Sequence, residues 1–121
     1  MPTLELDFAE ADEVVNEAFL EGGPAEKQTM WLEAFYQNAE RRLLNIYDRA
    51  RLRAWRIYDR KQAAAHWQEQ TEWFEGTLHS LERIQAKVSS FALPEIPALR
   101  SAIKTTREIV EACRGSYELF A

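Results

Sequence analysis

The amino-acid sequence predicts an all-α protein, an elongated bundle of about four helices with one long central amphipathic helix. Residues 25–75 contain neither glycine nor proline, the residues that interrupt helices most often. The tetrapeptide Ile-Tyr-Asp-Arg occurs at Ile46–Arg49 and again at Ile57–Arg60, eleven residues later. Eleven residues are close to three helical turns, so the two copies would stack along a single rod. No segment alternates with the period of a strand.

Length and composition predict a single all-helical domain over residues 1–121, long enough to bury a substantial core. The chain is 46% apolar and 29% charged, as is ordinary for soluble globular proteins. No apolar run approaches the ~20 residues that a membrane span needs. The acidic N-terminus differs from a signal peptide, which begins with basic and then apolar residues. We therefore expect a cytoplasmic protein with no membrane partner.

The first helix is expected to begin near Asp7, which forms a pattern like a capping box with Glu10. One side of this helix would be apolar and would carry Phe8, Ala11, Val15, Ala18 and Phe19. The segment 22–24, Gly-Gly-Pro, would end this helix and open the next one.

The central run predicts a long helix with one apolar face. At 100° per residue, that face collects Phe35, Ala39, Leu43, Ile46, Ala50, Ala54, Ile57 and Ala64. From Trp67 onward a second apolar stripe begins, which would lie nearly opposite the first on one continuous helix. An unbroken helix over 25–91 would be roughly 100 Å long, which is excessive for a chain of this size. We therefore predict a break between about Lys61 and Thr77, with residues 41–61 in one uninterrupted helix.

The second stripe and the last helix follow regular spacings. The second stripe contains Trp67, Phe74, Leu81, Ile84, Val88 and Phe91. Ser89, Ser90 and Pro94 predict a loop, and Pro97 would begin a final helix. The apolar side of that helix would carry Leu99, Ile103, Thr106, Val110, Cys113 and Tyr117. Cys113 is the only cysteine, so we expect a small buried residue and no disulfide bond.

Charge is distributed unevenly along a chain whose net charge is −5. Residues 1–26 hold eight acidic side chains and no lysine or arginine, whereas residues 41–61 hold eight basic ones. Five arginines would lie within an arc of about 60° on the central helix, namely Arg42, Arg49, Arg53, Arg56 and Arg60. Four glutamates would share one face of the first helix, namely Glu10, Glu13, Glu17 and Glu21. Such blocks are typical of interaction surfaces.

Leu44 and Trp55 would lie opposite the apolar face of the central helix, where they could anchor a partner. The sequence therefore favours a non-enzymatic helical interaction module. It would bind a protein partner or its own copies through the arginine stripe and the acidic helix. Such binding would be steered by charge and weakened by salt.

Two other functions are compatible with the sequence. Arginines interleaved with Tyr47, Trp55 and Tyr58 could bind a nucleic-acid backbone, in a small helical subunit of a larger ribonucleoprotein complex. The acidic balance of the chain opposes this hypothesis.

A small metal- or nucleotide-dependent helical enzyme is the third alternative. Its candidate ligands are His66, Glu69, Glu72, Glu75 and His79. Their spacings place them on different faces of one straight helix, and no second helix repeats the pattern. We therefore expect no cofactor and no catalytic residues.

Overall fold

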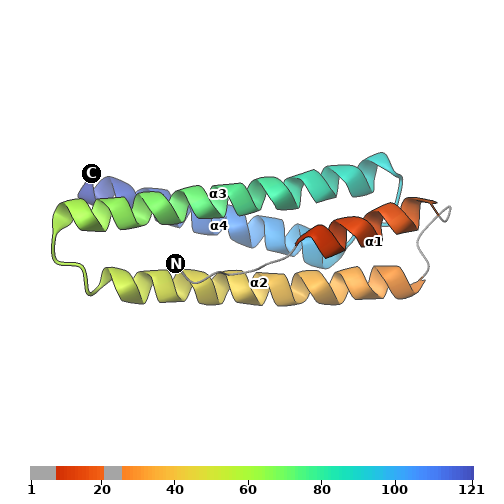
Figure 1. The fold of residues 1–121 in the computed structure, drawn as a ribbon, viewed down its shortest axis with the longest axis horizontal. Coiled ribbons are helices and arrows are strands. Elements are labelled where there is room, and N and C mark those ends of the chain that lie inside the picture. The colour runs from red at the N-terminus through yellow and green to blue at the C-terminus, as the bar shows by residue number, and fades with distance from the viewer. Residues whose placement is uncertain (1–7, 21–25) are drawn as a thin grey trace.

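The computed structural model describes residues 8–20 and 26–121, and no strand occurs in these ranges. They form four helices: α1 (Phe8–Leu20), α2 (Glu26–Ala54), α3 (Arg60–Ser90) and α4 (Pro97–Phe120). The helices alternate in direction along the chain and build an elongated bundle (Figure 1). The predicted all-α class, with about four helices and a long amphipathic one, is confirmed.

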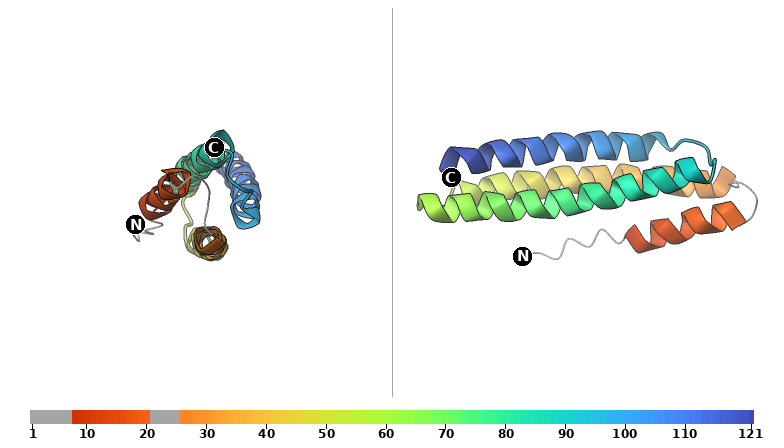
Figure 2. Two further views of the ribbon diagram at one scale, coloured as in Figure 1. Left: turned by 90° about the vertical axis from the view of Figure 1, so that its right-hand side faces the viewer. Right: turned by 90° about the horizontal axis from the view of Figure 1, so that it is seen from above.

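The three long helices form the body of the bundle, and α1 covers part of it. The most extensive contact joins α3 to α4, and α4 also packs along α2. α1 packs on α2 and α3, on the side away from α4 (Figure 2). With 13 residues against 29 in α2 and 31 in α3, α1 spans only one half of the bundle. That half lies away from the connection between α2 and α3 (Figure 1).

One apolar core runs along the bundle, and the predicted faces supply it. The predicted core positions that are buried are Ala11, Val15, Ala39, Leu43, Ile46, Ala50, Trp67, Phe74, Leu81, Ile84, Val88, Leu99, Ile103, Thr106, Val110 and Cys113. Burial raises the pKa of the Cys113 thiol to about 12. The thiol is therefore protonated at neutral pH, and this residue behaves as the small buried side chain that the sequence predicts.

Both ends of the connection between α3 and α4 are close to their predicted places. α3 ends at Ser90, so Ser89 and Ser90 belong to the helix rather than to the loop. α4 begins at Pro97 as predicted. Asp7 and the 22–24 segment lie outside the described residues.

The chain reverses between Ala54 and Arg60, upstream of the predicted position. α2 ends at Ala54, and the backbone N–H groups of residues 55–57 donate to carbonyls of its last turn at 3.0 to 3.3 Å. α3 then runs without interruption from Arg60 through the predicted 61–77 region, including Gly76. The predictions of a continuous helix over 41–61 and of a break after Lys61 are therefore wrong.

Asp59 explains why the reversal needs neither glycine nor proline. Its backbone is extended, with φ −81° and ψ 124°, and its Oδ1 accepts hydrogen bonds from the backbone N–H groups of Lys61 at 2.8 Å and Gln62 at 3.4 Å. An aspartate in this N-cap position stabilises a helix start by about 1 kcal/mol. Gln62 lies three residues later, which is the spacing of a capping box. In the first Ile-Tyr-Asp-Arg copy, the residue three positions after Asp48 is Arg51, which cannot complete a capping box, and Asp48 lies inside α2.

The reversal also divides the predicted arginine stripe. Arg42, Arg49 and Arg53 lie on α2, Arg56 is in the turn, and Arg60 is the first residue of α3. Because the predicted alignment requires one continuous helix, the stripe of five on a single face is wrong. Of the five predicted arginines, only Arg42, Arg49 and Arg53 share a flank of α2, within an arc of about 40° at 100° per residue.

We predict that the two copies of Ile-Tyr-Asp-Arg respond differently to loss of the aspartate. Asp59→Ala removes a helix cap and should lower the free energy of unfolding by about 1 kcal/mol. Asp48→Ala removes only an exposed ion pair with Arg51 at 3.8 Å and should change it by less than about 0.5 kcal/mol. Urea denaturation followed by circular dichroism measures both variants. Equal losses would contradict the assignment of Asp59 as the cap of the reversal.

Candidate functional site

The last turns of α2, the 55–59 turn, the start of α3 and the last turn of α4 meet at one end of the bundle (Figure 1). We call this region the turn end and define it as residues 47–67 and 116–120. α1 lies along the other half of the bundle, so it does not cover the turn end.

Exposed large apolar side chains gather at the turn end. Five of them are Leu52 (66% exposed), Trp55 (81%), Tyr58 (96%), Leu119 (73%) and Phe120 (37%). Elsewhere in residues 8–20 and 26–121, the exposed large apolar side chains are those of Met30, Trp31 and Leu44. Single exposed apolar residues are common, whereas a concentration of them is typical of interaction or ligand-binding surfaces.

The turn end also carries positive charge that the fold does not neutralise. The guanidinium groups of Arg49, Arg53 and Arg56 are exposed and form no hydrogen bond or ion pair within the described ranges. Arg51 pairs with Asp48 at 3.8 Å, and both side chains are more than half exposed. Such a pair is worth about 0–1 kcal/mol and is readily exchanged for another partner.

Two carboxylates of α2 present a clear contrast, because contacts with α4 inside the bundle engage them. Glu33 accepts a hydrogen bond from the backbone N–H of Ala98 at 2.6 Å, in the first turn of α4. Glu40 accepts hydrogen bonds from the hydroxyl groups of Ser101 at 3.0 Å and Thr105 at 2.7 Å. Glu33 and Glu40 thus hold α4 in place, whereas Arg49 and Arg53 near the end of α2 make no such contact with a described residue.

Arg60 has a different role from the other predicted binding arginines. Its Nε donates to the carbonyl of Phe120 and its Nη2 to the carbonyl of Leu119, both at 3.2 Å. The last carbonyls of a helix lack partners within the helix and carry partial negative charge. Arg60 therefore caps α4 and ties its end to the start of α3, so its main contacts are structural.

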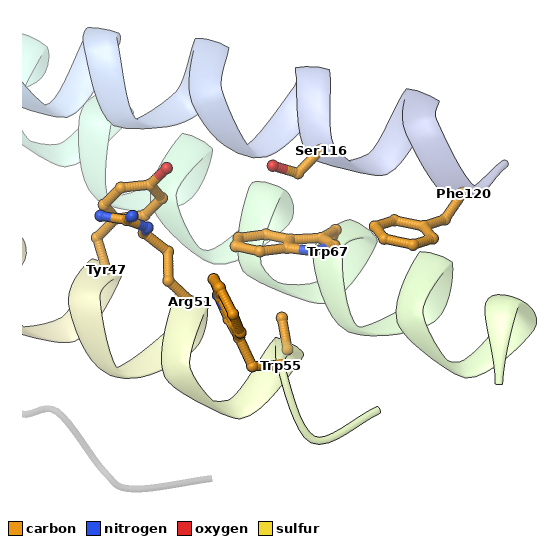
Figure 3. A pocket seen from close by; sticks show the side chains of 7 residues that line it. Tyr47, Arg51, Trp55, Trp67, Ser116 and Phe120 are labelled. Atoms are coloured by element: carbon orange, nitrogen blue, oxygen red, sulfur yellow. The ribbon is translucent and has the colours of Figure 1, made fainter. Parts of the chain in front are cut away.

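A cavity of about 340 Å³ opens between α2 and α4 at the turn end (Figure 3). It is lined by Tyr47, Arg51, Ala54, Trp55, Trp67, Ser116 and Phe120. Trp67 reaches into it from α3 and is buried, whereas Trp55 borders it from the end of α2 and is exposed. The Arg51 guanidinium lies over the Tyr47 ring, 5.8 Å from the ring centroid. Burial raises the pKa of Tyr47, so its phenol is neutral at physiological pH.

The predicted binding residues are therefore brought together only in part. Trp55 lies at the cavity, whereas Leu44 is 43% exposed and lies three turns away on α2. Glu13 and Glu17 are exposed on α1, away from the turn end. The side chain of Glu10, like the whole of Glu21, lies outside the described residues.

The sequence did not predict four residues of the site, namely Arg51, Leu52, Leu119 and Phe120. It named Tyr47 and Tyr58 only for the nucleic-acid alternative and Trp67 only as a core residue. The basic block over 41–61 could have pointed to Arg51. Whether α4 contributes side chains to the site depends on which helix ends lie together, and no local sequence pattern predicts this.

The candidate metal ligands of α3 are not brought together. The Nε2 atom of His66 lies within hydrogen-bond distance of the Ala50 carbonyl, at 3.0 Å. Glu75 pairs with Arg114 at 3.5 Å, and Glu82, which lines the same α3–α4 groove, pairs with Arg107 at 2.8 Å. In the described part of the chain, no group of three histidine, cysteine, aspartate or glutamate side chains could hold a metal ion.

Among the described helices, none is both long and apolar enough to cross a membrane. Comparison with protein-family models, with curated proteins and with solved structures found no match to this chain.

We predict that Trp55 contributes little to stability, although it is one of the largest side chains. Trp55→Ala should change the free energy of unfolding by less than about 0.5 kcal/mol, because 81% of the side chain is exposed. Trp67→Ala should cost about 3–5 kcal/mol, because it empties a core position that is 4% exposed. Thermal and urea denaturation of both variants provide the measurement. A loss at Trp55 comparable to that at Trp67 would show that Trp55 is a core residue and not an available surface.

Proposed function

We propose that this protein is a helical interaction module that binds another protein at its turn end. The expected partner segment is an amphipathic helix that carries aspartate or glutamate beside apolar and aromatic residues. One observation carries the proposal: unpaired arginines and exposed large apolar side chains occur together at one end of the bundle.

The two kinds of side chain support different parts of the binding energy. Covering a large apolar side chain is worth about 2–3 kcal/mol, and Trp55 and Tyr58 are almost fully available for this. Arginines at the edge of a contact contribute mainly to the rate of encounter and to partner choice. Arg49, Arg53 and Arg56 border the apolar side chains in sequence, so they favour a partner that is acidic around an apolar centre.

A second copy of the chain suits this surface less well than a different protein does. A symmetric contact between two turn ends would bring the same arginines against one another, which is repulsive. The acidic α1 of another copy, with Glu13 and Glu17 exposed, offers opposite charge. That contact joins different faces of the two copies, so it would continue into open-ended chains instead of closing as a dimer.

Binding of a single-stranded nucleic acid is the second candidate function. The observation that favours it is that Trp55 and Tyr58 are exposed within the arginine-rich segment, where bases could stack while phosphates contact the guanidinium groups. The net charge of −5 opposes the approach of a polyanion. We rank this function below protein binding for that reason.

We predict that charge reversal at the turn end weakens partner binding at least tenfold. The test variant is R49E/R53E/R56E, and the matched control is K27E/R83E/K104E, which reverses three exposed cations elsewhere and changes the net charge equally. Affinity purification from the source cells identifies candidate partners, and each candidate is then purified. Kd is measured by isothermal titration at 50 and 500 mM NaCl. Three exposed charges at about 0.5–1 kcal/mol each correspond to about 10- to 150-fold in affinity.

The expected result is binding that weakens with salt, is lost in the test variant and persists in the control. Equal loss in both variants, or affinity independent of salt, overturns the proposal. A single-stranded oligonucleotide that binds the wild type with steep salt dependence, where no protein does, assigns the turn end to nucleic acid instead. Salt-sensitive oligomers of the purified chain in sedimentation, abolished only by the test variant, assign it to a second copy.

A further inference from the structure

We infer that the cavity between α2 and α4 receives one aromatic side chain of the partner, with a neighbouring carboxylate on Arg51. This inference rests on the proposed function and specifies the anchor residue that the partner must carry. The cavity lies within the turn end, beside the exposed Trp55, so a bound helix would pass directly over its opening.

The size of the cavity selects the occupant. About 340 Å³ is near the lower limit of natural ligand pockets, which span about 300–1,000 Å³. A space of this size holds one ring system but not a stretch of backbone. A single inserted side chain, surrounded by contacts on the flanking surface, matches the usual anatomy of a binding hot spot.

The walls of the cavity favour an aromatic group. Trp67 forms a fixed wall: its ring centroid lies 6.4 Å from that of Tyr47 and 5.1 Å from that of His66, and the side chain is 4% exposed. These separations fall within the range in which aromatic rings attract one another. Trp55 and Phe120 border the space from α2 and α4 and are both exposed. An inserted ring would therefore meet aromatic surface from three helices.

Arg51 adds a preference for a carboxylate. The Tyr47 ring beneath its guanidinium group holds the group at the cavity, where it can donate hydrogen bonds to a carboxylate. Within the described chain the ion pair of Arg51 with Asp48 is long and exposed, and it would give way to a better-placed carboxylate. The Ser116 hydroxyl is the other small polar group at the lining. A cationic ligand finds no carboxylate among the lining residues.

We predict that the cavity binds indole-3-propionate more tightly than tryptamine, which has the same ring system but an amine in place of the carboxylate. The chain contains four tryptophans, whose indole N–H resonances report separately in ¹⁵N–¹H spectra. Trp55 and Trp67 line the cavity, and Trp31 and Trp73 do not. With indole-3-propionate, the first two resonances should shift saturably, with a Kd on the order of 1 mM for a ligand of this size. Tryptamine and propionate should bind at least tenfold more weakly.

A pair of neighbouring variants controls the experiment. Ser116→Met places a long side chain at the cavity lining and should abolish the shifts. Gly115→Met changes the adjacent exposed position of α4, where an added Cβ meets no atom within 4 Å, and should leave binding unchanged. Shifts of all four resonances alike, no saturable shift, equal affinity for tryptamine, or equal effects of the two variants would each overturn the inference.

The outcome is separable from that of the proposed function, because this experiment needs no partner protein. If the cavity fails to bind indole-3-propionate, the inferred site for an aromatic anchor residue is wrong. The charge-reversal experiment still decides whether the turn end binds a protein. Conversely, if R49E/R53E/R56E leaves the affinity of a purified partner unchanged, the proposed function is wrong, even if the cavity binds indole-3-propionate.

Discussion

The reversal of the chain between Ala54 and Arg60 is the constraint on which the rest of the structure depends. Asp59 caps α3 and directs it back along the bundle, where α4 can pack against both α3 and α2. Arg60 then ties the last carbonyls of α4 to the same place. These two adjacent residues therefore stabilise the place where three helix ends meet, and that meeting forms the turn end with its cavity.

The use of charge along α2 connects the fold with the proposed function. Glu33 and Glu40, in the first part of α2, are engaged by α4. Near the end of α2, Arg49 and Arg53 have no counterpart among the described side chains, and the apolar residues beside them are exposed. α2 buries one face in the core along its length and exposes Arg49 and Arg53 near its end, so the proposed docking there need not disturb the core.

Much of the fold could be predicted from the sequence, since the apolar periodicity identified the buried faces of α2, α3 and α4. The change of register near Trp67 also showed correctly that one rod could not continue. The position of the break was not predicted, because it depends on Asp59 acting as the N-cap of α3. An aspartate can also lie inside a helix, and only the glutamine three residues later, Gln62, distinguishes the two cases. Trp55 was predicted to lie opposite the apolar face, and its side chain is exposed. The cavity beside it was not predicted, since Ser116 and Phe120 reach it only through tertiary packing.

The most direct test of this account is the distance between spin labels at positions 41 and 72, measured by pulsed electron resonance. Arg41 and Glu72 are both exposed, on α2 and α3 respectively, at similar distances from the reversal. Two helices folded back on each other place the labels within about 30 Å, two or three helix diameters. A central helix that continues through Asp59 would separate them by roughly 45 Å and would contradict the hairpin, the cavity and the turn end together.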